Sequence, residues 1–235
     1  MKLLVVIVLL TFSLMGGRGL VSGKIELGSE FTIGIESMGL HRVLGPLKGV
    51  VSGLAWVEVF RYQRAFQFEE VDARTRWICA LQPHVVEGWD YLSWNLAFNL
   101  FAEAGESDAE REKWLRRGLE QLDLGLSLNR GSSRLLYSKA VTLFIRSKDS
   151  TVLEMLSLIL NEDPVELAAD LGVASQMLKK GNYPEATMVV GMLQRASRYE
   201  AAIAACDALE NRFPNQRKTL HKLKRLFAEE KNADS

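Results

Sequence analysis

From position 50 onward, hydrophobic residues recur every three or four positions, and glycines and prolines interrupt the pattern at short intervals. This period is typical of amphipathic helices, and the interruptions mark turns, so the pattern predicts about ten helices joined by short turns. The segment 85–104 is apolar around most of its circumference, so we expect it to be central. The expected helices are 50–66, 69–81, 85–104, one capped by Ser107, one capped by Ser133, 150–160, 165–180, 184–196, 199–212 and 216–230.

Start and stop signals support several of these boundaries. Pro83 should end the second helix, because proline disfavours helical backbone in the residue before it. Ser107, with Glu110 three residues later, fits a capping box, and Ser133 is the expected N-cap of the next helix. Pro164 suits the first position of a helix.

One spacing occurs twice along the chain. The tetrapeptide Phe68-Glu69-Glu70-Val71 precedes Pro83 by fifteen residues, and Tyr199-Glu200-Ala201-Ala202 precedes Pro214 by the same interval. In each copy an aromatic residue opens a helix, a small or β-branched residue follows three positions later, and a proline stops the next turn. This spacing is typical of the second half of a helix-turn-helix repeat with a period near 34 residues.

Two segments resemble the helices of a tetratricopeptide repeat. The second helix of that repeat is matched by Tyr199, Glu200, Ala202, Cys206, Leu209 and Pro214, and the first by Trp89, Leu92, Ser93 and Leu96. Residues 40–150 resemble uncharacterised bacterial membrane-anchored proteins with divergent helices of this type. The resemblance implies an all-α superhelix, or solenoid, of tetratricopeptide-like hairpins, and such stacks usually bind other proteins.

The resemblance also implies that the first helix of each pair lines a concave groove. The groove-facing candidates for partner binding are Glu87, Asp90, Trp94 and Phe98 in one repeat, and Thr187, Gln194 and Arg195 in the last. Asn95 and Asn99 lie four apart on one helix face. They either bind a ligand backbone or bridge two helices, and the second is the commoner role for buried amides.

The first 23 residues read as a targeting segment. Lys2 precedes an apolar run from Leu3 to Met15, which suits a signal peptide, and the following Gly-rich residues extend it toward a membrane anchor. A cleaved signal and a retained anchor both stay open. Residues 24–48 read as a Gly-rich tether with a short extended piece. The expected location is the cell membrane, through a single-pass anchor with the rest facing the periplasm, or an exported form.

The remaining chain is expected to form two helical blocks, 49–150 and 151–235. All five tryptophans lie between Trp56 and Trp114, so the first block should have the denser core and bury most of its rings. The last helix should cap the array. Its exposed face is basic and opposes an apolar face, so contact with anionic lipid head groups or with an acidic partner is an alternative role. The basic residues are Lys218, Lys222 and Arg225, and the apolar ones are Leu220, Leu223 and Phe227.

Charge and motif content argue against several function classes. Lys and Arg balance Asp and Glu at 29 each, so no net field attracts nucleic acid. The histidines His41, His84 and His221 lie far apart, and we find no phosphate loop or nucleophile elbow. We therefore expect no catalytic residue, no metal and no cofactor. Cys79 and Cys206 should be buried in helices, and a disulfide between them stays open.

The expected function is a non-catalytic interaction scaffold that binds a partner protein or peptide at the bacterial cell envelope. One alternative is a periplasmic chaperone or assembly factor whose groove takes extended clients. A second alternative, from another class, is a cell-wall or glycan enzyme. A scaffold should have one stoichiometric partner, a chaperone many weakly bound clients, and an enzyme a deep polar pocket with convergent carboxylates.

Overall fold

The structure is a computed structural model that describes residues 47–179 and 181–233. The chain divides into two compact units, 1–43 and 44–235, and the described residues all belong to the second. The expected signal or anchor and most of the tether lie outside the described residues, and only the end of the tether, at Lys48, begins a helix. In the part that is described, no helix is long and apolar enough to cross a membrane.

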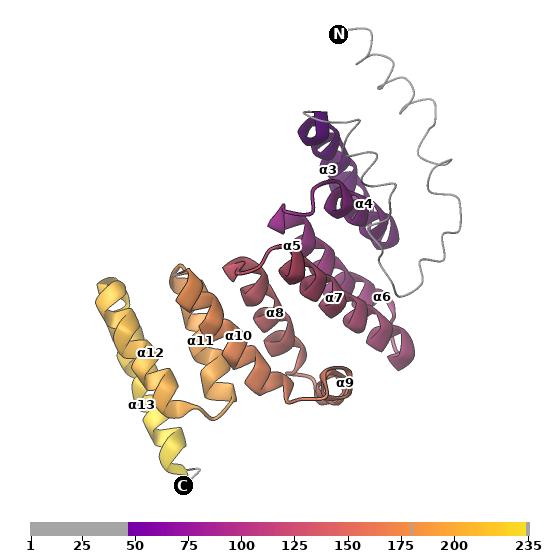
Figure 1. The fold of residues 1–235 in the computed structure, drawn as a ribbon. Coiled ribbons are helices and arrows are strands. Elements are labelled where there is room, and N and C mark those ends of the chain that lie inside the picture. Colours follow the sequence, from indigo (N-terminus) through magenta and orange to yellow (C-terminus); the bar gives the residue numbers. More distant parts are fainter. Residues whose placement is uncertain (1–46, 180, 234–235) are drawn as a thin grey trace, which may run out of the picture. The chain divides into compact units, whose positions relative to one another are not determined.

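The all-α prediction is confirmed for the described residues, which form helices and turns without a strand (Figure 1). The predicted bounds of 150–160 and 199–212 are reproduced. The helices are α3 (Lys48–Arg64), α4 (Phe68–Leu81), α5 (Val86–Trp94), the π-helical η2 (Asn95–Leu100), α6 (Phe101–Glu103), α7 (Asp108–Leu128), α8 (Ser133–Arg146), α9 (Ser150–Leu160), α10 (Pro164–Leu178), α11 (Tyr183–Arg195), α12 (Tyr199–Arg212), the 3₁₀ turn η3 (Pro214–Gln216) and α13 (Arg217–Ala233).

Side-chain caps fix several helix starts. The Ser107 hydroxyl accepts a hydrogen bond from the Glu110 amide at 3.4 Å, so this predicted cap is confirmed. The predicted Ser133 cap is wrong, because Ser132 is the N-cap and accepts from the Leu135 amide at 3.3 Å. An N-cap needs extended backbone, which Ser132 has and the helical Ser133 lacks.

The expected helix 85–104 is one continuous helical run made of α5, η2 and α6. Its central position is confirmed, since Trp89, Leu92 and Leu96 are fully buried. The Asn95 amide donates to the Phe68 carbonyl at 3.0 Å, and Asn99 donates to the Asn95 side chain at 3.0 Å. The amide pair therefore bridges the run to α4, as expected for buried amides.

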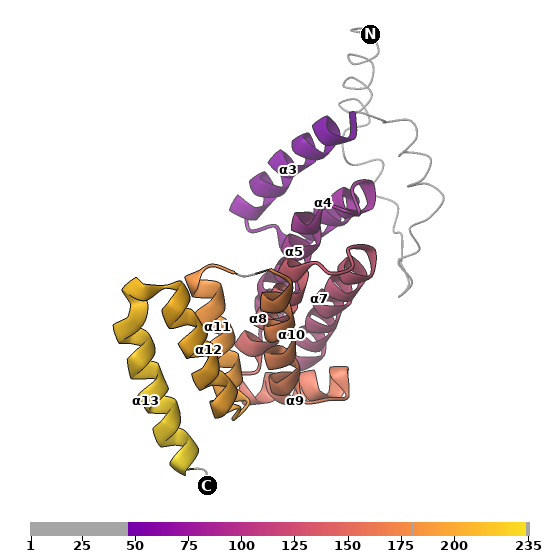
Figure 2. The same cartoon turned by 60° about the vertical axis from the view of Figure 1, so that its left-hand side comes forward.

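Neighbouring helices pack in a consistent order (Figures 1 and 2). The closest pairs are α3 with α4, α5 and η2 with α7, α8 with α10, and α12 with α13. Contacts from α4 to α5, from α5 and α7 to α8, from α10 to α11 and from α11 to α12 connect these pairs. Helix α9 lies crosswise at the foot of α8 and α10 in both views.

The larger hydrophobic core runs from Ala97 to Phe227, across the expected boundary between the two blocks. A smaller core lies between α3 and α4 around Val59 and Val71. Helix α13 closes the larger core with Leu220 and Phe227, while Lys218, Lys222 and Arg225 face solvent, as the sequence pattern predicts.

The tryptophans are less buried than the sequence suggests. Trp89 is fully buried, and its indole N–H donates to the Pro83 carbonyl at 2.8 Å. The side chains of Trp56, Trp77 and Trp114 are half-buried against the two cores. Trp94 is 45% exposed and lies on the surface of α5. Only one of the five rings is therefore a full core residue.

Candidate binding groove

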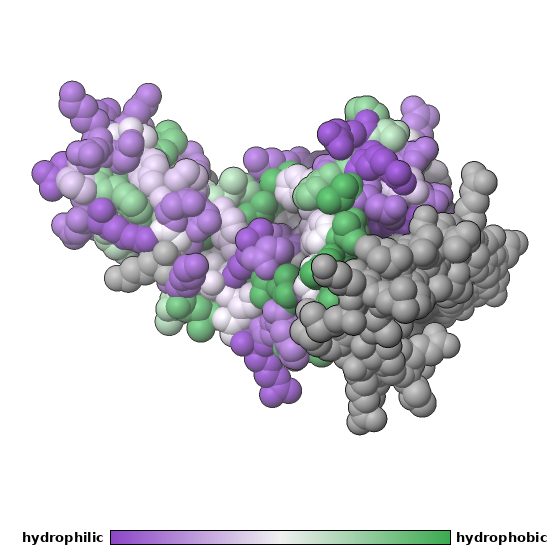
Figure 3. Space-filling model, turned by 90° about the horizontal axis from the view of Figure 1, so that it is seen from above, coloured by the Kyte–Doolittle hydropathy of each residue, from purple (hydrophilic) through white to green (hydrophobic). Residues whose placement is uncertain are grey.

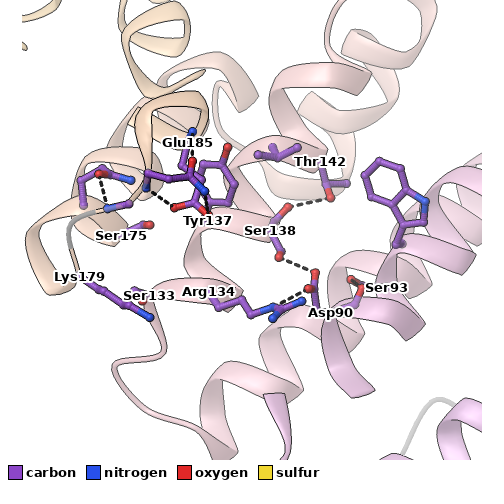
Figure 4. Close-up of a pocket in the computed structure, with 15 residues that line it drawn as sticks. Asp90, Ser93, Ser133, Arg134, Tyr137, Ser138, Thr142, Ser175, Lys179 and Glu185 are labelled. Atoms are coloured by element: carbon purple, nitrogen blue, oxygen red, sulfur yellow. Dashed lines mark hydrogen bonds and ion pairs between the residues drawn. The ribbon is translucent and has the colours of Figure 1, made fainter. Parts of the chain in front are cut away.

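A cavity lies between α5 and α8 and extends to the end of α10 and the start of α11 (Figure 4). Its volume is about 590 Å³. Helices α5, α8, α10 and α11 thus contribute to one surface. The lining residues are Asp90, Ser93, Trp94, Ser133, Arg134, Tyr137, Ser138, Val141, Thr142, Ser175, Gln176, Lys179, Gly181, Asn182 and Glu185.

A second cavity of about 420 Å³ lies next to the first, between α3, α5 and α8. It shares three residues with the first cavity, Asp90, Trp94 and Arg134, so the two cavities are adjacent, and we call them together the groove. We call the second cavity the aromatic cleft; its remaining residues are Trp56, Phe60, Glu87 and Tyr91. Hydrophobic residues gather in the middle of the face that Figure 3 presents, between α3 and the C-terminal helices.

A fixed polar cluster stands where the two cavities meet. Arg134 Nε donates to Asp90 Oδ2 at 2.8 Å, and Ser138 Oγ donates to Asp90 Oδ1 at 2.6 Å (Figure 4). The hydrogen bond with Asp90 raises the pKa of Arg134, so this guanidinium stays charged. Both Asp90 oxygens are engaged, so this cluster shapes the groove floor and holds its charges in place.

The opposite wall is polar and comes from the turn between α10 and α11. Gln176 accepts from the Gly181 amide at 3.0 Å, and Glu185 accepts from the Asn182 amide at 3.1 Å in a capping box. Lys179 stands exposed at the edge of this wall. The groove therefore carries charges of both signs at its two sides.

The structure brings together three of the four candidates on the first repeat, because Glu87, Asp90 and Trp94 all line the groove. The fourth, Phe98, lies behind Trp94, and the two rings stack with centroids 3.9 Å apart. The Arg146 guanidinium covers Phe98 at 4.4 Å from the ring centroid. Phe98 thus supports the position of Trp94 and does not line either cavity.

The three candidates on α11 do not line either cavity. The Thr187 hydroxyl donates to the Tyr183 carbonyl at 2.9 Å, within its own helix. Gln194 donates to the Glu230 carboxylate of α13 at 2.9 Å, and Arg195 donates to the Ser147 carbonyl at 2.7 Å. Their polar groups are occupied by neighbouring helices.

Sequence reasoning did not find the contributions of α3 and α8. Arg134, Tyr137 and Ser138 lie three or four positions apart on one face of α8, which is a detectable pattern. That pattern identifies an exposed face but not the helix opposite it. Trp56 and Phe60 show the same spacing on α3, where sequence reasoning assigned most rings to the core.

The groove offers binding groups, and its lining contains no histidine. Elsewhere in the described chain, His84 is exposed in the turn after α4, and no group of three potential metal ligands occurs. Cys79 and Cys206 are buried and free. Burial raises the pKa of the Cys79 thiol to about 12 and that of Cys206 to about 11, so both are protonated at neutral pH.

Comparison of the chain with protein-family models, with curated proteins and with solved structures found no match.

Proposed function

We propose that this protein is a non-catalytic binding scaffold whose groove holds an extended segment of a partner protein. The observation that carries the proposal is the pair of adjacent cavities lined by residues of α3, α5, α8, α10 and the start of α11. A surface made by successive helical pairs is the one that helical-repeat proteins use for binding. The cavity volume is in the range of sites that bury a ligand.

The composition of the groove supports a peptide-like ligand. Exposed rings such as Trp94 supply apolar contact area, and the polar side chains nearby supply hydrogen-bond donors and acceptors. Interfaces between proteins favour this mixture of aromatic anchors and polar rim. We also propose that the pairs continue as a tetratricopeptide-like solenoid, with α13 as its cap.

The place of action is proposed from the sequence alone. The apolar run that begins at Leu3 is typical of a signal or an anchor, so we place the scaffold at the bacterial cell envelope. The partner is therefore a protein or peptide that meets the described helices outside the cytosol.

Site-specific photo-crosslinking in living cells tests this proposal. Benzoylphenylalanine replaces Tyr137 in the groove or, as the control, Glu120, an exposed residue of α7 that does not line either cavity. We expect one adduct of defined mass from position 137 and none from position 120. A ladder of adducts from position 137 supports the chaperone alternative, whereas equal labelling at both positions, or none at 137, contradicts binding in the groove.

A further inference from the structure

Several aromatic side chains in the described part of the chain have a cation over the ring. Arg146 lies between two rings, 4.4 Å from the centroid of Phe98 and 4.0 Å from that of Phe101. The cationic groups of Arg61 and Arg74 lie over the Tyr62 ring, and those of Lys113 and Arg117 lie over the Trp114 ring. Such cation–π contacts are favourable because the face of the ring is electron-rich.

The rings of the aromatic cleft pack against one another instead. Their centroids are 5.8 Å apart for Trp56 and Phe60 and 5.3 Å apart for Trp56 and Tyr91. Among the residues that the structure describes, no lysine or arginine lies over the rings of Trp56, Phe60, Tyr91 or Trp94. Phe60 is 49% exposed, so its ring is accessible from solvent.

One side of the Trp94 ring stacks on Phe98, and the rest of the side chain is partly exposed. Phe98 covers one face of the indole at 3.9 Å, and Arg146 covers the far face of Phe98. The outer side of Trp94 faces the groove, since the ring lines both cavities. The order Arg146, Phe98, Trp94 leaves an aromatic surface where one more planar cation fits.

The charges around the cleft favour a positive ligand. Glu87 and Asp90 stand at its edge, and Arg134 is the single basic lining residue. Arg134 is held by Asp90 at 2.8 Å and by Glu87 at 3.4 Å, which leaves the rim with one net negative charge.

We propose that the aromatic cleft is the anchor site for a basic side chain, arginine above lysine, on the partner segment that occupies the groove. A guanidinium is planar and weakly hydrated, so it stacks on indole and phenyl rings better than an ammonium does. The role in anchoring rests on the proposed function, but the affinity of the cleft for a guanidinium is a property of the cleft itself and is testable alone.

The test uses two small probes of matched shape, N-acetyl-arginine amide and N-acetyl-citrulline amide, which differ in the charge of the terminal group. The full chain is labelled with 5-fluorotryptophan, kept in a non-ionic detergent and titrated while ¹⁹F NMR follows its five tryptophans. We expect the arginine probe to shift the Trp56 and Trp94 resonances at millimolar concentration. The citrulline probe should leave them in place, and Trp89 and Trp114 should respond to neither.

Two variants sharpen the assignment. Phe60→Leu removes a ring of the cleft, and Glu87→Gln removes one rim charge. Each substitution should lower the affinity of the protein for the arginine probe by about fivefold. Phe66→Leu is the matched control, because it removes an exposed ring outside the cleft and should leave affinity unchanged. Equal shifts by both probes, no shift by arginine, or equal loss in the Phe66 control would overturn the proposal.

These results are separable from the proposed function. If the arginine probe shifts Trp94 while crosslinking at position 137 fails, the cleft binds cations and the groove does not hold a partner segment. If crosslinking succeeds and the arginine probe fails, the partner uses another anchor, and an apolar side chain becomes the alternative.

Discussion

Helices α5 and α11 carry six of the seven candidate groove residues, and all three on α5 line the groove whereas none on α11 does. Trp94 lines both cavities, whereas Gln194 is bonded to Glu230 and Arg195 to the Ser147 carbonyl. The difference arises from the neighbours, because α13 supplies the carboxylate that occupies Gln194. Alignment to a helical repeat therefore identifies which residues of a helix point to the same side. Whether those residues can bind a partner depends on the contacts that neighbouring helices make with them.

The two regions also differ in the atoms that a side chain added at a helix-contact glycine would meet. On the N-terminal side, a Cβ at Gly125 of α7 would lie 2.9 Å from Trp89 Cβ, and one at Gly118 would lie 3.2 Å from the backbone nitrogen of Ala97. On the C-terminal side, a Cβ at Gly172 of α10 would first meet the Met192 sulfur at 2.9 Å. The first contacts are with rigid groups, and the last is with the movable end of a side chain.

The largest effect should come from adding one methyl group at these glycines. Gly125→Ala should lower the free energy of unfolding by about 2 kcal/mol, because Trp89 is fully buried and cannot move aside. Gly172→Ala should change it by less than about 1 kcal/mol, since the helix-propensity gain offsets a small shift of Met192. Urea denaturation of both variants measures the difference. Equal losses would show that the two regions are packed with the same rigidity.

A second contrast separates binding from stability. Trp94→Ala should weaken partner binding by at least about tenfold, because exposed aromatic anchors dominate interface energies. Gln194→Ala should leave partner binding unchanged and lower the free energy of unfolding by about 1 kcal/mol through loss of its bond to Glu230. Crosslinking yield at position 137 and thermal unfolding of each variant test this. Weaker partner binding by Gln194→Ala would show that α11 takes part in partner binding, which contradicts this prediction.

The smallest effect concerns a property that the regions share. Cys79 and Cys206 keep their protons in the fold above the ordinary thiol pKa of 9.0, while the unfolded chain releases them. The unfolded state therefore binds fewer protons, and the free energy of unfolding falls as the pH rises from 9.0 to about 12 for Cys79 and to about 11 for Cys206.

The Cys79 thiol should account for about 1 kcal/mol of this loss near pH 10. Cys79→Ala and Cys206→Ala should each flatten the alkaline decline relative to the unchanged chain, and denaturation curves collected at several alkaline pH values measure that slope. A slope that neither substitution changes would mean that the thiols are not shielded from water in solution.

Local signals made much of the fold predictable from the sequence. Asp163 caps α10 directly before Pro164, and its carboxylate accepts from the Val165 amide at 2.7 Å. Such signals involve residues a few positions apart, so they can be recognised in a short stretch of sequence. At α8 the sequence predicted the wrong N-cap, because the adjacent residues Ser132 and Ser133 have the same side chain. Backbone geometry decides which of the two caps the helix.

The groove was predictable only in part, since it depends on contacts between distant segments. The candidates on α5 could be placed because the resemblance to a repeat assigns a concave side to that helix. Arg134 and Ser138 meet Asp90 from more than forty positions away, and Glu230 reaches Gln194 across 36. The periodicity of one helix does not identify its partners in other helices. The pairing of α8 with α10 and the contact between Gln194 of α11 and Glu230 of α13 could therefore be found only in the structure.

The crosswise position of α9 gives the chain a permissive site for protein engineering. The turn after α9, residues 161–163, is exposed. Exposed turns of this kind accept inserted domains. A fluorescent reporter placed between Asn161 and Glu162 would follow the protein in cells without entering the groove.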